Sequence, residues 1–173
     1  MPFDFEIDKL THSLEDAASG DILLTEVLPL EKADLKDISK KSGWKFNWNT
    51  EFITPEKQVF KLILQKEPKI IQGLICLEKK NDHIFMPLIE TAPHNFGKTK
   101  KYLGVAANLV AFICKLSFEN GFDGYVAFEA KTKLIPHYEK TLGAKLLFGQ
   151  QMELGTHASI KLIKDYYPEF FNQ

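Results

Sequence analysis

The sequence contains no arginine: all 22 of its basic residues are lysine. Arginine supplies the planar fork that favours two-point contacts to base edges and phosphates, and lysine does not. The formal net charge of -1 also lacks the broad positive field that nonspecific nucleic-acid binding requires. We therefore expect no nucleic-acid partner, although an AT-rich genome would produce the same lysine bias.

Cysteine is scarce as well, with only Cys76 and Cys114, each inside an apolar run. Without a CxxC motif they are expected to be small buried core residues in a reducing compartment. The N-terminus MPFDFEIDKL has early acids and no apolar core, so we expect no secretory signal. The longest apolar stretch, residues 103–114, is too short to span a bilayer. A cytoplasmic protein without membrane association is the expectation.

What is present is ordinary globular composition, with 45% hydrophobic and 26% charged residues in 173. A chain of this length buries roughly two thirds of the surface that its unfolded form exposes, so it needs no disulfide or metal. No repeat or proline-rich linker divides the sequence. We expect a single domain over residues 1–173, in which residues 1–20 form an N-terminal extension made of an extended piece and a helical turn.

The hydrophobic periodicity predicts an α/β fold with a central mixed sheet and helices on both faces. The short KEP and KND connections favour an antiparallel meander in the middle of the chain. The expected strands are 22–28, 59–65, 70–80, 82–91, 124–130, 144–150 and 152–163, and the expected helices are 31–41, 101–120 and 134–142.

A site for an anion is indicated at the start of the long helix, in the run Lys101-Tyr102-Leu103-Gly104-Val105-Ala106. Gly104 lets the backbone approach a ligand closely, and the small Ala106 keeps the helix start uncluttered. The unpaired N–H groups and the helix dipole favour a pyrophosphate there. Lys98, Lys100 and Lys101 add positive charge at the same place. An ordinary lysine-flanked helix start is the alternative.

This hexapeptide resembles the cofactor loop of the GNAT superfamily of N-acetyltransferases, Arg/Gln-x-x-Gly-x-Gly/Ala. Lys101 stands at the first position, and Tyr102 stands where a second glycine is common. Downstream, the run from residue 134 to 144 is similar to the family's helix that ends Tyr-Glu-Lys-Leu-Gly-Phe, with Thr141 inserted and Ala144 in place of the aromatic residue. The resemblance covers the element order of residues 20–163.

The resemblance implies a GNAT-like acyl-CoA N-acyltransferase fold and an acetyltransferase that uses acetyl-CoA as co-substrate. It also accounts for Pro87, because the corresponding strand of the family is bulged and separates from the next strand, where the pantetheine arm of the cofactor pairs with it. Alternatively, Pro87 marks an edge strand or ends a strand early. The cofactor-binding residues that it implies are Ile89, Thr91, Lys101, Tyr102, Leu103, Gly104, Val105, Ala106 and Lys131.

Two catalytic residues follow from the resemblance. Tyr138 matches the tyrosine that gives a proton to the departing thiolate, and Glu90 lies where the family keeps a general base or a residue that positions water. Packing of Tyr138 against the sheet and solvation of Glu90 at the surface are the alternatives. His137 and His94 are weaker base candidates. Lys131 replaces an asparagine that often holds the cofactor.

For the acceptor, the aromatic loop containing Trp44 and Trp48 is predicted to wall the substrate site, with core packing as the alternative. The five histidines show no metal-ligand spacing, so no metal is expected. The expected partners are acetyl-CoA and an amine acceptor, which can be a polyamine, an antibiotic, a peptide N-terminus or a lysine, and a homodimer stays open.

Two other functions remain. One is an acyl-CoA-binding module without efficient catalysis, and the other is a toxin-like acetyltransferase that acts on charged tRNA through a local lysine patch.

Overall fold

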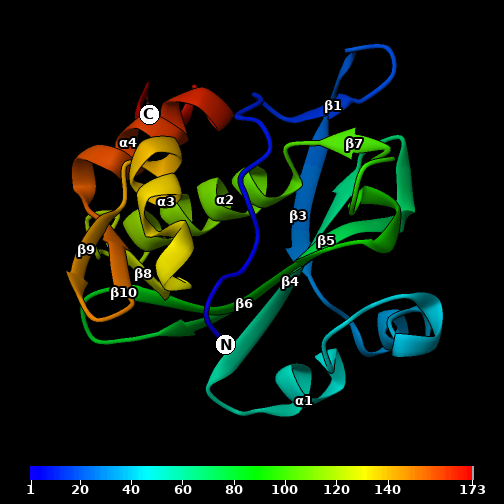
Figure 1. Cartoon of the computed structure of the whole chain (residues 1–173), viewed down its shortest axis with the longest axis horizontal. Coiled ribbons are helices and arrows are strands. Elements are labelled where there is room, and N and C mark those ends of the chain that lie inside the picture. Colours follow the sequence, from blue (N-terminus) through cyan, green and yellow to red (C-terminus); the bar gives the residue numbers. More distant parts are fainter. Residues whose placement is uncertain (173) are drawn as a thin grey trace.

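The computed structural model of the chain describes residues 1–172, and a large twisted sheet forms its centre (Figure 1). Within those residues this sheet has seven strands in the order β3-β4-β5-β6-β8-β10-β9. Among the described strands all neighbours in it pair antiparallel, except β6 and β8, which are parallel. Its strands are β3 (Thr25–Pro29), β4 (Lys57–Leu64), β5 (Glu67–Lys79), β6 (Ile84–Thr91), β8 (Val126–Glu129), β9 (Lys145–Phe148) and β10 (Gln151–Leu154).

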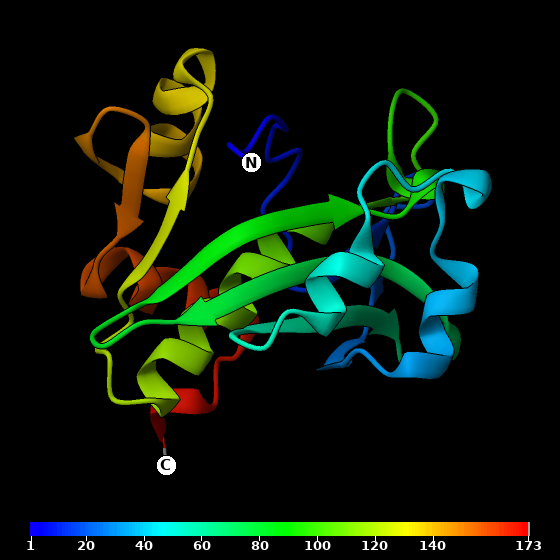
Figure 2. The ribbon, with the colours of Figure 1, turned by 90° about the horizontal axis from the view of Figure 1, so that it is seen from below.

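Helices cover both faces of the sheet (Figure 2). α2 lies against one face and carries α4 on its outer side, burying Leu109 and Leu162 in the larger core. The other face is covered by α1 and two 3-10 turns, which bury Ile38, Trp44 and Trp48. The helices are α1 (Trp48–Ile53), α2 (Val105–Glu119), α3 (Ile135–Leu142) and α4 (Thr156–Tyr166), and the 3-10 turns are 32–37, 40–42, 93–95, 132–134 and 170–172. The predicted mixed sheet with helices on both faces is confirmed.

A small second sheet changes the start of the long helix. It pairs β2 (Ile22–Leu23), β1 (Leu14–Asp16) and β7 (Tyr102–Leu103) in that order. The prediction of a helix from residue 101 is therefore wrong, because residues 102–103 pair with β1 and Gly104 follows with a left-handed φ of 91°. α2 begins only at Val105.

Three other expectations are corrected. Residues 152–163 are not one strand: the buried alternation of β10 ends at Gly155, and Ser159, Leu162 and Ile163 then follow at helical spacing in α4. The helix expected over residues 31–41 is two 3-10 turns, because Ile38 between them is extended and buried. The extension of residues 1–20 contains β1 rather than a helical turn.

The expected bulge near Pro87 is confirmed by the register of β5 and β6. Cys76 pairs with Leu88 and Glu78 pairs with Phe85, so β6 holds one residue more than β5 between these pairs. Pro87 lies in this extra length, where a missing N–H costs no ladder hydrogen bond. An extra residue bends a strand, and the bend directs the end of β6 away from its next neighbour, β8.

Candidate functional site

β6 and β8 separate soon after they meet. Their parallel ladder consists of Ile84 with Val126 and Phe85 with Ala127, and among residues 1–172 the remainder of β6 pairs only with β5. A cavity of about 470 Å³ opens beyond this point, with a wall that is mostly apolar. It is lined by residues 88–91 of β6 together with Phe46, Phe96, Ala106 and Lys131, and by the N-terminal residues 1–5. The bulge at Pro87 thus creates an opening inside the sheet.

The N-terminus of α2 lies beside this cavity and already holds an anionic group. The N–H of Gly104 donates to Asp8 Oδ1 at 3.2 Å, and Lys100 Nζ lies 3.1 Å from Asp8 Oδ2. A backbone N–H outside the helical hydrogen bonds, the positive end of the helix dipole and a lysine make this a favourable position for a carboxylate or a phosphate. The sequence predicted this cradle but not the acid that lies in it.

The predicted cofactor-binding residues divide into two groups. Ile89, Thr91, Ala106 and Lys131 all line the cavity. The predicted residues of the loop 101–105 do not line the cavity. The Tyr102 ring and Val105 are buried in the larger core, and Leu103 pairs with β1. All of their binding roles stay predictions.

Tyr138 lies on α3 and is fully buried. Its ring packs edge-on against Phe5 and Phe128, and its hydroxyl donates to the backbone oxygen of Phe5. Burial raises the pKa of this hydroxyl well above its ordinary value, so it stays protonated at neutral pH. Tyr138 does not line the cavity, but Phe5 does, so the protonated phenol can reach the cavity as an acid only when Phe5 moves away. Because the hydroxyl is bonded to Phe5 in this structure, the catalytic role of Tyr138 stays a prediction.

Glu90 lines the cavity and also holds the aromatic loop in place. Its carboxylate accepts hydrogen bonds from the N–H groups of Lys45 at 2.7 Å and Phe46 at 3.3 Å, and from Trp48 Nε1 at 2.8 Å. A carboxylate has about four acceptor positions, so three donors leave room for about one more. Glu90 thus positions the loop, and its role as a general base stays a prediction.

The two tryptophans predicted at the substrate site lie in the core of the other sheet face. Trp44 is 6% exposed and Trp48 is 1% exposed, and neither lines the cavity. Phe46, between them in sequence, lines the cavity together with Phe96. Lys45 Nζ lies over the Phe96 ring, 3.5 Å from its centroid. Alternation along GWKFNWN does not predict this arrangement, because residues two apart lie on the same face of an extended chain and all three aromatic residues would then point the same way.

The two histidines considered as bases both take part in hydrogen bonds. His137 Nε2 accepts from the N–H of Ile7 at 2.8 Å. His94 Nε2 lies 2.8 Å from Gln72 Oε1, and burial, followed by the charge of Lys101, lowers the pKa of His94. Both histidines therefore hold neighbouring segments together in this structure.

Both cysteines are buried, as the sequence predicted. Burial raises the pKa of Cys76 and of Cys114 to about 12, so neither is a thiolate nucleophile at neutral pH. Within residues 1–172 no group of three or more histidine, cysteine, aspartate or glutamate side chains is placed to hold a metal ion. No helix in the same range combines the length and the apolar character needed to cross a membrane.

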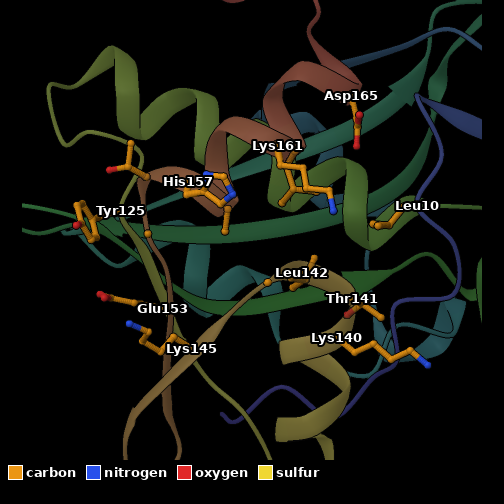
Figure 3. Close-up of a pocket in the computed structure, with 15 residues that line it drawn as sticks. Leu10, Tyr125, Lys140, Thr141, Leu142, Lys145, Glu153, His157, Lys161 and Asp165 are labelled. Atoms are coloured by element: carbon orange, nitrogen blue, oxygen red, sulfur yellow. The ribbon is translucent and has the colours of Figure 1, made fainter.

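A second cavity of about 540 Å³ lies between the end of α3, β10 and α4 (Figure 3). Its labelled side chains carry both signs of charge, from Lys140 and Lys161 to Glu153 and Asp165. It includes none of the residues predicted to be catalytic or to bind a cofactor or substrate, and its wall is about half polar. The opening between β6 and β8 is therefore the stronger candidate, since it joins an apolar channel to an anion cradle.

No protein-family model matches the chain, and no curated protein does. Solved structures do match. The spermidine N-acetyltransferase of Vibrio cholerae in complex with CoA and spermine has a TM-score of 0.53 and 15% identity, over 79% of this chain and 98% of that one. The same organism's spermidine/spermine N-acetyltransferase with manganese ions has a TM-score of 0.55 and 16% identity, over 80% and 96% of the two chains.

The ribosomal-protein-S18-alanine N-acetyltransferase of Escherichia coli has a TM-score of 0.52 and 14% identity, over 75% of this chain and 90% of that one. At such identities the similarity establishes the fold. The chain therefore has the fold of the GNAT N-acetyltransferases, which the motifs between residues 101 and 144 predicted.

Proposed function

We propose that this protein is an N-acetyltransferase, which transfers the acetyl group of acetyl-CoA to an amine. The observation that carries the proposal is the opening between β6 and β8, because it lies next to the N-terminus of α2. A long cofactor with a pyrophosphate in its middle and an uncharged arm needs an anion cradle and an adjoining apolar channel. The GNAT fold of the solved neighbours supports the same assignment.

In this proposal the N–H groups at the start of α2 bind the pyrophosphate, with Lys100 and Lys101 as point charges. The uncharged arm lies along residues 88–91 of β6, on the edge where the ladder to β8 has ended. Acetyl-CoA supplies an activated thioester. The chain aligns that thioester with the acceptor in the cavity, which lowers the entropic part of the barrier.

The chemistry then needs one base and one acid. The neutral amine nitrogen forms a bond to the acetyl carbon, the carbon–sulfur bond breaks, and the amine loses a proton. We assign that proton to Glu90, or to water held by it, and the proton for the departing sulfur to Tyr138. Phe46 and Phe96 provide an apolar wall beside Glu90 for the acceptor.

The test is an acetyl-transfer assay with a panel of amines: spermidine, spermine, a peptide with N-terminal alanine, and a lysine peptide. Formation of free CoA thiol and of acetylated product, detected by mass spectrometry, is the expected result for at least one of them. Phe46→Ala is expected to raise the KM for the acceptor, whereas Phe148→Ala, on the exposed strand β9, is expected to leave it unchanged.

Binding of acetyl-CoA without transfer to any amine would favour the alternative, an acyl-CoA-binding module. Absence of both binding and transfer would contradict the proposed function.

A further inference from the structure

The N-terminal residues 1–8, called the strap below, run through the candidate cofactor cleft beside α3 (Figure 1). Phe3 forms a parallel bridge with Ala130, just beyond the end of β8. Its N–H donates to the oxygen of Glu129 at 2.7 Å, and its oxygen accepts from the N–H of Lys131 at 3.0 Å. Because β10 occupies the other edge of β8, the strap lies on the edge that faces β6. It therefore fills part of the opening between the two strands.

The strap is held by apolar contacts as well as by its backbone. Phe3 is 3% exposed and stacks on Phe128, with ring centroids 4.9 Å apart. The backbone oxygen of Phe5 accepts a hydrogen bond from the Tyr138 hydroxyl, and the N–H of Ile7 donates one to His137 Nε2. The strap is thus held against β8 through Phe128 and against α3 through Tyr138 and His137.

The acids of the strap neutralise the cations that a phosphate-bearing ligand would use. Asp4 lies 3.0 Å from Lys131 Nζ and 3.7 Å from Lys133 Nζ. Asp8 forms an ion pair with Lys100 and accepts a hydrogen bond from the N–H of Gly104 at the start of α2. Asp4 thus lies with Lys131 at the wall of the cavity, and Asp8 lies with Lys100 at the start of α2. The strap and an anionic cofactor require the same donors.

We propose that the strap is an autoinhibitory segment, which competes with acetyl-CoA for the cleft and must leave before the cofactor binds. This inference rests on the proposed function. The ion pairs of Asp4 are half exposed and therefore weak, so a ligand that brings a pyrophosphate and an apolar arm can displace them. Departure of the strap also frees the Tyr138 hydroxyl from Phe5, so the same movement opens the cofactor site and releases the proposed acid.

The test is calorimetry of CoA with the full chain and with the Asp4→Ala/Asp8→Ala double variant, which keeps the apolar contacts of the strap. If the strap is closed nine times in ten in the unaltered chain and open in the double variant, the double variant binds CoA about 10-fold more tightly. Glu6→Ala is the matched control, because Glu6 belongs to the same segment and its side chain is exposed. This control is expected to leave the affinity unchanged.

A second measurement follows the strap itself. In amide hydrogen exchange of the unaltered chain, the N–H groups of Phe3 and Ile7 are expected to lose protection when CoA is added. A synthetic peptide MPFDFEID is expected to weaken CoA binding to the double variant, and the same peptide with both aspartates replaced by asparagine is expected to compete less.

The outcomes separate the two proposals. Equal CoA affinity of the unaltered chain and the double variant, with the Phe3 and Ile7 amides still protected, would overturn the strap proposal and leave the proposed function intact. No CoA binding by either protein would overturn both.

Discussion

Replacing Gly104 by alanine is expected to lower the free energy of unfolding by about 3 kcal/mol. Gly104 has a φ of 91°, in the left-handed region that side chains disfavour. An added Cβ would also overlap Thr11 Oγ1 and lie 3.3 Å from the oxygen of Ser13. Thr11 is buried and its hydroxyl donates to that same oxygen, so neither group can move without cost.

Gly20→Ala is the matched control for this variant. Gly20 has a similar φ of 79°, and an added Cβ would have no atom within 4 Å among the described residues. Gly20→Ala is expected to lower the free energy of unfolding by about 1 kcal/mol, the cost of the left-handed conformation alone. Urea unfolding of both variants measures the difference. Equal losses would mean that residues 11–13 do not pack against the start of α2 as the structure describes.

Replacing Tyr138 by phenylalanine in the Asp4→Ala/Asp8→Ala chain is expected to lower kcat for acetyl transfer by about 100-fold. The departing sulfur leaves as a thiolate, and without the hydroxyl no positioned acid protonates it. The variant keeps the ring, which packs against Phe5 and Phe128, so the fold is expected to survive. The KM for acetyl-CoA is expected to change little, since the hydroxyl acts in the transition state.

Tyr125→Phe serves as the control for Tyr138→Phe, because Tyr125 is a 39% exposed tyrosine and does not line the cleft cavity. Its kcat is expected to equal that of the parent chain. An unchanged kcat in Tyr138→Phe would assign the hydroxyl solely to holding Phe5, and the catalytic assignment would fail.

Local patterns predicted the parts of the fold that depend on neighbouring residues. The meander of β4, β5 and β6 follows from three strand-like runs with short connections. The expected ends of the helices at residues 120 and 142 lie close to the observed ones, and Gly121 and Gly143 follow them with a positive φ, which glycine adopts readily. Pro87 indicated a bulge, because a proline is tolerated in a strand where a ladder bond is already missing.

The parts that depend on distant partners could not be predicted. Phe3 forms an isolated bridge with Ala130, and no local pattern marks Phe3 as the partner of a residue so distant in the sequence. Trp44 and Trp48 are as apolar as Phe46, so hydrophobicity alone cannot decide which of them faces the core and which the cavity. Residues 152–163 were expected to form one strand, because a short apolar run is compatible with either a strand or a helix and its pattern alone could not separate β10 from α4.

The residues predicted to bind a cofactor show the same division. The anion cradle follows from Gly104 and the helix after it, which are adjacent in sequence. Residues 101–103 were expected in the helix, but residues 102–103 pair with β1. Asp8 was not foreseen as their neighbour, because it comes to Gly104 from 96 positions away.

The most direct test of this account is a titration of acetyl-CoA followed by backbone amide NMR. The account predicts that the largest shift changes fall in residues 88–91 of β6 and at Gly104, Val105 and Ala106 at the start of α2, with changes in residues 1–8 as the strap leaves. Changes confined to the cavity between α3 and α4, around Lys140 and Lys161, would contradict it, and so would a spectrum that acetyl-CoA leaves unaltered.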